Sequence, residues 1–341
     1  MSVDPSTLLT RAVDGGTLNA KEAAGVFGAI MAGNVHETAM AALLTAMAVR
    51  GPTVDEITGA ATAMRAAMIT VTAPDGAVDL CGTGGDGHGT LNISTAVSFV
   101  VAACGVPVAK HGNRNISSKT GAADVLEALG VKIGLSPAEA ETCLREAGLC
   151  FLFAQTYHPG MKHVTPVRKA LGIRTIFNLL GPLSNPARVR RQLIGVYAPD
   201  MVEPLARVLG ALGAERAWVV HGNDGLDEIT TTDITHVAVL DAGRVTARIV
   251  GPDDIGAPRA TLDSLKGGSA DVNAAAVRRL FDGETGPYRD IVLLNAAAAL
   301  IVAGKTDDLR SGAEMAAKVI DTGAAKNTLA KLVAVSNGSA S

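Results

Sequence analysis

Residues 79–95 read DLCGTGGDGHGTLNIST, a short apolar segment that runs into a glycine-dense loop and then into a second apolar segment. The first segment predicts a buried strand, and the uncharged residues 93–104 predict a helix after the loop. The pattern then repeats, with a strand at 106–110, a polar loop and a helix at 121–130. Strand, loop and helix in this order are typical of a parallel sheet with helices on its faces. The stretch therefore predicts an α/β fold.

Outward from this unit, short apolar runs predict further strands of the same sheet at 150–154, 192–197, 217–222 and 236–240. Helices are expected between many of them. One begins after Ser136, where a capping serine is followed by proline and then by Glu139. The segment from about residue 270 onward again predicts helices. We expect a large domain with a mainly parallel sheet flanked by helices.

The N-terminal part predicts helices only, with capping boxes beginning at Asn19 and at Thr53. A later segment fits a sheet poorly but fits short helices with proline-rich joints, and we expect it to return to the N-terminal helices. The alanine- and methionine-rich run 39–49 suits close helix packing, so we expect a homodimer formed through this part. The predicted division is a small, discontinuous helical domain, 1–72 with about 158–187, and a large α/β domain, 73–157 with 188–341.

Composition narrows the classes of function. The chain has 341 residues, 48% of them apolar and 18% charged, which is enough for a substantial core. The formal net charge of −3 argues against a protein that mainly coats nucleic acid or an acidic membrane. The N-terminus lacks the apolar run of a signal peptide. The cysteines lack metal-site spacing and are expected to be reduced thiols of a cytoplasmic protein: Cys81, Cys104, Cys143 and Cys150.

The loop at 82–90 contains Gly-x-Gly-x-x-Gly between a strand and a helix, which alone suggests a dinucleotide-binding turn. That interpretation needs an acid near the end of the next strand, but this strand ends in Lys110 and continues as His-Gly-Asn-Arg at 111–114. A Walker A loop is excluded because no Gly-Lys-Ser/Thr follows. Either loop alone is explained equally well by glycine turns and solvated lysines. Together, at neighbouring carboxyl ends of parallel strands, they predict a phosphate site.

The stretches 79–95, 108–130 and 158–187 closely resemble the anthranilate phosphoribosyltransferase family of tryptophan biosynthesis, and the resemblance extends over almost the whole chain. It implies a nucleoside phosphorylase/phosphoribosyltransferase-like fold. It also implies Mg²⁺-dependent transfer of phosphoribose from 5-phosphoribosyl 1-diphosphate to the amine of anthranilate. The products would be N-(5-phosphoribosyl)anthranilate and diphosphate. Because pyrimidine nucleoside phosphorylases share the fold, the fold alone would not decide the reaction.

The resemblance also implies roles for individual residues. Phosphoribosyl diphosphate would contact two loops and the helix starts beside them, through Gly82, Gly85, Asp86, Thr90, Asn92, Ile93, Ser94, Thr95, Lys110, His111, Gly112, Asn113, Arg114, Asn115, Ile116, Ser117, Ser118 and Ala122. Anthranilate would contact Gly82, Asn113, Arg168, His111 and His158. Two magnesium ions would be held by Ser94, Asp227 and Glu228. No side chain is assigned as a nucleophile or general base.

Arg168 also has an independent rationale, since a guanidinium can hold a carboxylate through two parallel hydrogen bonds. Taken alone, an arginine in a helical segment is more often part of a surface salt bridge, and His158 is more often a structural histidine. The adjacent acids Asp227 and Glu228 supply the oxygen ligands that Mg²⁺ prefers, although most acidic pairs on loops are merely solvated. The family resemblance therefore decides these assignments.

Some positions depart from the family pattern. Ala122 stands where serine is more frequent, Gly160 replaces a common alanine, and Asn115 with Ile116 is a minor variant. These differences bear on ligand affinity more than on the type of reaction. The alternatives are a pyrimidine nucleoside phosphorylase and a non-catalytic, nucleic-acid-binding relative of the same fold. The intact glycine loop, the acidic pair and the net charge argue against the second.

Overall fold

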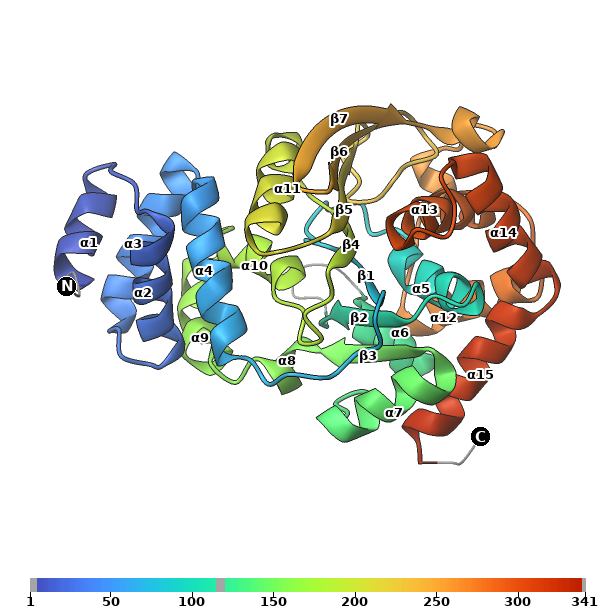
Figure 1. The fold of residues 1–341 in the computed structure, drawn as a ribbon, viewed down its shortest axis with the longest axis horizontal. Helices are drawn as coiled ribbons and strands as arrows, with labels where there is room; N and C mark the ends of the chain where they lie inside the picture. Colours follow the sequence, from blue (N-terminus) through green and yellow to red (C-terminus); the bar gives the residue numbers. More distant parts are fainter. Residues whose placement is uncertain (1–4, 115–119, 339–341) are drawn as a thin grey trace.

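The computed structural model describes residues 5–114 and 120–338, and these contain one mixed sheet of seven strands. The strand order is β3-β2-β1-β4-β5-β6-β7, in which β1 to β5 are parallel and β6 and β7 are antiparallel to their neighbours (Figure 1). The bounds are Val78–Gly82 for β1, Val108–Gly112 for β2, Leu149–Phe153 for β3, Arg191–Gly195 for β4, Arg216–Gly222 for β5, Thr235–Asp241 for β6 and Arg244–Val250 for β7. Loops that follow β1 and β2 therefore open at the same edge.

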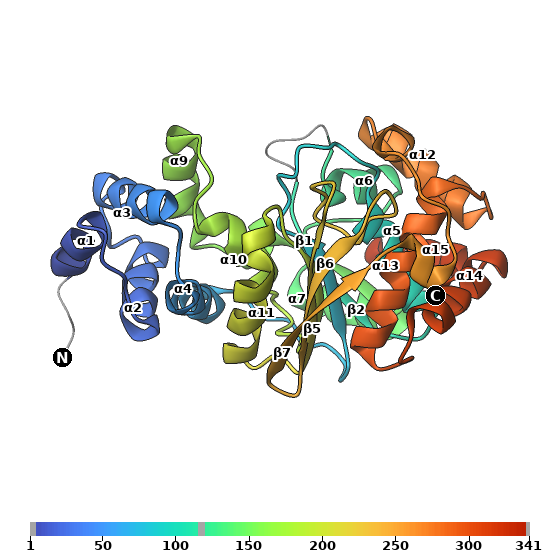
Figure 2. The same ribbon diagram turned by 90° about the horizontal axis from the view of Figure 1, so that it is seen from above.

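Helices cover both faces of the sheet. Figure 2 shows α5, α13 and α14 on one side of the strands and α11 on the other. On the first side the bounds are Ile93–Ala103 for α5, Ala270–Phe281 for α12, Pro287–Ala303 for α13, Leu309–Asp321 for α14 and Ala324–Ser336 for α15. The bounds of the other helices that follow β2 are Ala122–Ala128 for α6, Pro137–Ala147 for α7, Ala154–Tyr157 for α8 and Val202–Ala211 for α11. Three 3-10 turns lie at Pro199–Met201, Pro252–Ile255 and Leu262–Leu265.

The N-terminal helices stand at one end of the molecule (Figure 1). They are α1 (Pro5–Val13), α2 (Ala20–Met31), α3 (Glu37–Arg50) and α4 (Val54–Ala67). Helix α9 (Met161–Leu171) returns to pack on α2 and α3, and α10 (Phe177–Leu183) packs on α4. The predicted capping boxes at Asn19, Thr53 and Ser136 are present, so these local signals correctly placed the starts of α2, α4 and α7.

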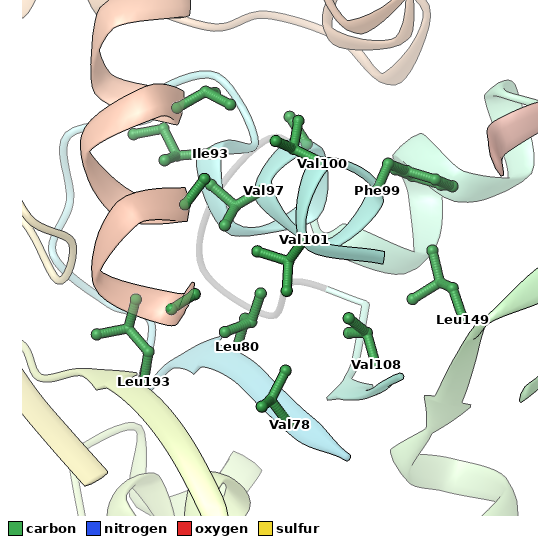
Figure 3. Close-up of a cluster of buried hydrophobic side chains, with 14 of the residues drawn as sticks. Val78, Leu80, Ile93, Val97, Phe99, Val100, Val101, Val108, Leu149 and Leu193 are labelled. Carbon is green, nitrogen blue, oxygen red and sulfur yellow. The ribbon is translucent and has the colours of Figure 1, made fainter. Parts of the chain in front are cut away.

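The core is built from aliphatic side chains, as the low aromatic content of 3% requires. One cluster fills the space between α5 and strands β1, β2 and β3, and it includes Val78, Val97, Val101 and Leu149 (Figure 3). A second cluster runs from the N-terminal helices through α10 and α11 to the other face of the sheet, where it includes Ile194. The helical end and the sheet thus share continuous apolar packing.

The structure adds strand β7, which the sequence did not predict. Residues 242 and 243 form a two-residue turn with φ of 48° and 78°, and the hairpin closes with Asp241 opposite Arg244. Both φ values are positive, as in the type I′ turns that suit the twist of a hairpin. Most side chains of β7 are exposed, because β7 is an edge strand. It therefore lacks the buried apolar pattern that revealed the other strands.

The predicted helix at 93–104 and the predicted strand at 106–110 are confirmed as α5 and β2. The uncharged stretch 91–109 contains the whole of α5 and the start of β2, and no helix in the described ranges is long and apolar enough to cross a membrane. All four cysteines lie within these ranges as free thiols, with Cys143 and Cys150 buried and Cys81 and Cys104 half-buried.

Gly59 on α4 offers a test of the helical packing. An added methyl group there would lie 2.3 Å from the carbonyl oxygen of Ala20 and 2.6 Å from Cβ of Ala23, both on α2. Gly59→Ala should therefore lower the free energy of unfolding by about 1–3 kcal/mol, measured by chemical denaturation. The matched control is Gly25→Ala on α2, where the methyl group meets open space and should add about 0.5–1 kcal/mol. Equal effects at the two sites would contradict this packing.

Candidate functional site

The glycine loop between β1 and α5 has a backbone that only glycine adopts readily. Gly84, Gly85, Gly87 and Gly89 have φ between 63° and 82°. Distant segments hold the loop at both ends. Near its start, Thr83 N donates to Gly195 O at 2.9 Å; near its end, a backbone bridge joins Thr90 to Lys266. The loop is thus a shaped cradle, and the N–H groups of Gly85, Gly87 and Gly89, which make no described hydrogen bond, could bind an anion.

The acidic pair reaches this loop from 143 positions further along the chain. Asp227 Oδ2 accepts a hydrogen bond from Gly84 N at 2.7 Å, and Glu228 Oε1 accepts one from Ser94 N at 3.2 Å. The approach is close because Gly195 carries no side chain: a Cβ there would lie 1.5 Å from the carbonyl oxygen of Asp227. The structure therefore brings the candidate metal ligands Ser94, Asp227 and Glu228 together.

The electrostatics of this cluster suit a hard cation. Burial, together with repulsion from Asp86, raises the pKa of Asp227, and burial with repulsion from Asp227 raises that of Glu228. A bound divalent cation would relieve both effects. In the described part of the chain, no three His, Cys, Asp or Glu side chains are grouped to hold a metal ion alone. The cluster thus fits Mg²⁺ that shares its coordination with substrate phosphates and water.

Lys110, in the middle of β2, lies below the glycine loop. Its side chain is buried, and its Nζ donates hydrogen bonds to Leu80 O and, at 3.2 Å, to Ser94 Oγ. The ammonium group also lowers the pKa of Glu228. Ser94 therefore lies at the centre of the site. Its Oγ accepts a hydrogen bond from the Lys110 ammonium, and its N–H donates one to the Glu228 carboxylate.

His111 and His158 form a buried pair on the other face of β2. Their Nε2 atoms are 3.1 Å apart, and His111 Nδ1 is 3.0 Å from Gly181 O. Burial lowers the pKa of His111 to about 3, with a contribution from His158, and burial lowers that of His158 to about 4. Both rings are therefore neutral at physiological pH. With Nδ1–H of His111 donating to Gly181 O, His111 Nε2 accepts a hydrogen bond from Nε2–H of His158.

Arg168 lies near the end of α9, which continues through Pro166. It is partly buried, and this burial lowers its pKa. Its Nη2 donates a long hydrogen bond of 3.5 Å to Asn178 Oδ1, and its guanidinium lies 6.0 Å from the centre of the Phe177 ring. A guanidinium held this loosely has donors free to turn toward a carboxylate.

The remaining predicted residues fall into distinct groups. Asn92 accepts from Asn273 Nδ2 at 2.8 Å, and the buried Thr95 hydroxyl has no hydrogen-bond partner among the described residues. Asn113 is exposed, and Arg114 pairs with Asp124 and Glu127 of α6 rather than with the site. The structure places Gly82 at the end of β1, Gly85 and Asp86 in the glycine loop, and Ile93 at the start of α5. It places Gly112 at the end of β2 and Ala122 at the start of α6. Asn115, Ile116, Ser117 and Ser118 lie outside the described residues.

The structure also places residues here that sequence reasoning missed. Arg174, between α9 and α10, donates to Gly85 O and stacks 4.3 Å from the centre of the Tyr197 ring. Tyr288 donates to Asn92 O at 3.2 Å. Asp79 and Asn185 hydrogen-bond beneath the site at 2.7 Å. The three hydrogen bonds join residues at least 89 positions apart, so no local sequence pattern could have predicted them.

Comparison with known proteins agrees with this geometry. Residues 6–68 match the glycosyl transferase family helical bundle domain, and residues 74–326 match the a/b domain of the same family. Anthranilate phosphoribosyltransferase of Rhodopseudomonas palustris (strain HaA2) is 57% identical over 98% of this chain and 99% of its own. That of Parvibaculum lavamentivorans is 56% identical over 98% of both chains.

Solved structures point the same way. Anthranilate phosphoribosyltransferase of Thermus thermophilus superposes with a TM-score of 0.92 at 43% identity, covering 97% of this chain and 99% of that one. The Saccharomyces cerevisiae protein in complex with PRPP and Mg has a TM-score of 0.89 over 98% of both chains, and at 24% identity this is a likeness of fold. The identities over nearly the whole length decide the assignment. The chain belongs to the anthranilate phosphoribosyltransferase family.

Proposed function

We propose that this protein transfers the phosphoribosyl group of 5-phosphoribosyl 1-diphosphate to the amine of anthranilate, a step of tryptophan biosynthesis. The observation that carries the proposal is the convergence on Ser94. Its N–H donates to Glu228, its hydroxyl accepts from Lys110, and the glycine loop lies beside it. Loop amides, a cation and an acidic pair are the groups that a diphosphate with magnesium requires. No observation favours a nucleoside phosphorylase or a nucleic-acid-binding protein.

Each part of the site has a role in this reaction. The glycine loop and the start of α5 hold the diphosphate, and Lys110 supplies positive charge below it. Ser94 with Glu228 would hold one Mg²⁺, and Asp227 with Glu228 a second. When bound, Mg²⁺ neutralises the charge that develops on the departing diphosphate. The anthranilate amine then attacks C1′ of the ribose from the opposite face, so that orienting two substrates is the main task of the protein.

Anthranilate is expected between the glycine loop and α9. Arg168 would face its carboxylate, and the neutral His111–His158 pair would border the path of its ring. Because burial lowers the pKa of both histidines and keeps them neutral, they present little charge to an aromatic acceptor. Gly82 and Asn113 would complete the contacts. No side chain needs to act as a nucleophile, since diphosphate is itself a good leaving group.

We also propose a larger organisation. The helices within 1–72 and 158–187 would form one domain that closes on the α/β domain, bringing Arg168 toward the glycine loop. The exposed apolar side chains of Val13 on α1 and Val49 on α3, 57% and 84% exposed, support a homodimer through this domain. Light scattering should then give about twice the 34.6 kDa of one chain. The free thiols support a cytoplasmic location.

The reaction itself is tested by the fluorescence of anthranilate. We expect the fluorescence to fall only when the protein, phosphoribosyl diphosphate and Mg²⁺ are all present, because the acceptor amine becomes ribosylated. Chelation of the metal should stop the decrease. A folded protein that binds phosphoribosyl diphosphate but leaves anthranilate unchanged would contradict the proposed acceptor.

Arg168→Ala should raise the KM for anthranilate at least about tenfold, because a pair of charge-assisted hydrogen bonds to its carboxylate is lost. The KM for phosphoribosyl diphosphate should change little. The exposed neighbour Lys169 provides the matched control, and Lys169→Ala should leave both constants near those of the unaltered protein. An unchanged anthranilate KM in Arg168→Ala would show that another group holds the carboxylate.

Asp227→Asn combined with Glu228→Gln should raise the Mg²⁺ concentration needed for half-maximal turnover by roughly 10- to 100-fold or more. Loss of even an outer partner of a metal site has effects of this size. Titrating Mg²⁺ at saturating substrates measures the change. Asp253→Asn, at an exposed acid outside the site, is the control. Equal Mg²⁺ requirements in the double variant and the control would refute this assignment.

A further inference from the structure

The parallel ladder between β1 and β2 opens at the edge of the sheet where the site lies. Strand β1 pairs with β4 along five residues, and β2 pairs with β3 along five, but β1 and β2 pair only at Val78 and Val108. If that register continued, Leu80 would face Lys110, and Leu80 would bond to the backbone of Ala109 and His111. The opening therefore changes the partners of four buried backbone groups, namely the N–H and C=O of Leu80, the C=O of Ala109 and the N–H of His111.

Side chains supply partners for three of these four groups. Asp79 Oδ1 accepts from His111 N at 3.0 Å, and Asn185 Nδ2 donates to Ala109 O at 2.8 Å. Leu80 O, the third group, accepts from the Lys110 ammonium. Each of the three backbone groups is thus paired with a polar side chain.

Asp79 and Asn185 form one unit within this opening. Asn185 Nδ2 also donates to Asp79 Oδ2 at 2.7 Å, and Asn185 Oδ1 accepts from Ala187 N at 2.7 Å. Asp79 is fully buried, and Asn185 is 2% exposed. Neither side chain touches the loop or the acidic pair in any described contact. Asp79 Oδ1 and Asn185 Nδ2 instead bond to the backbone of β2 where β1 and β2 have separated.

We propose that Asp79 and Asn185 are positioning residues that keep the β1–β2 ladder open so that Leu80 O can anchor the Lys110 ammonium beneath Ser94. In a closed ladder, Leu80 O would accept a hydrogen bond from His111 N, and the Lys110 ammonium would compete with that bond for the same carbonyl. One of the two anchors of the ammonium would then be weakened, and the positive charge below Ser94 and Glu228 would lose its fixed position. The proposal rests on the proposed function only for the identity of the ligand, phosphoribosyl diphosphate.

Calorimetric titration with phosphoribosyl diphosphate and Mg²⁺ tests this role without requiring turnover. Asn185→Leu should weaken binding about tenfold, the effect of losing roughly one charge-assisted hydrogen bond. Asp79→Asn should weaken it similarly, because its amide would face that of Asn185. The control is Gln192→Leu on the adjacent strand β4, whose buried amide donates to Pro182 O at 2.9 Å. That control should change stability without changing binding.

A double-mutant cycle separates positioning from general destabilisation. If Asn185 acts through Lys110, then adding Asn185→Leu to Lys110→Met should change the dissociation constant by less than about twofold. The same loss in both backgrounds would overturn the proposal, as would weakened binding in Gln192→Leu. Should Asn185→Leu fail to fold, the isosteric Asp79→Asn provides the same cycle. A protein that binds the ligand but does not consume anthranilate would contradict the proposed acceptor and leave this test intact.

Discussion

The contact of Asp227 with the ends of β1 and β4 is the constraint on which the site depends. A side chain at Gly195 would overlap the backbone of Asp227, and one at Gly82 would come within 2.3 Å of its carboxylate. Because both positions are glycine, the loop that carries the acidic pair lies directly on the sheet edge. From there Asp227 reaches Gly84, and Glu228 reaches Ser94. The β1–β4 ladder beneath this contact is fully paired, so the edge is rigid where the acids rest.

Much of this arrangement follows from local sequence. The alternation of buried strands, loops and helices predicts the parallel sheet, and the capping boxes locate helix starts because a cap is made within four residues. Strand β7 was missed because an exposed edge strand does not need buried apolar residues. The contacts of Arg174 and Asn185 were missed for another reason: they join segments that only the folded sheet brings together. Arg114 lies in the expected loop, but its ion pairs with α6 depend on where that helix packs.

The N-terminal helices and the sheet are joined by side-chain packing as well as by the chain segments that connect them. The second apolar cluster continues from the N-terminal helices through α10 and α11 onto the sheet. Near the site the contact between these two parts is polar instead: Arg174, which lies between α9 and α10, donates to Gly85 O and stacks on the ring of Tyr197. Tyr197 N also donates to Thr83 Oγ1 at 3.1 Å, which links this polar contact to the glycine loop.

The backbone of the glycine loop has a consequence for reading genetic variation. Gly84, Gly87 and Gly89 have open space where a side chain would project, yet their positive φ makes any other residue strained. Replacement at these positions will impair the protein even where the glycine touches nothing. A saturation scan would therefore show intolerance at each of these glycines, and at these positions the path of the chain is by itself a sufficient cause.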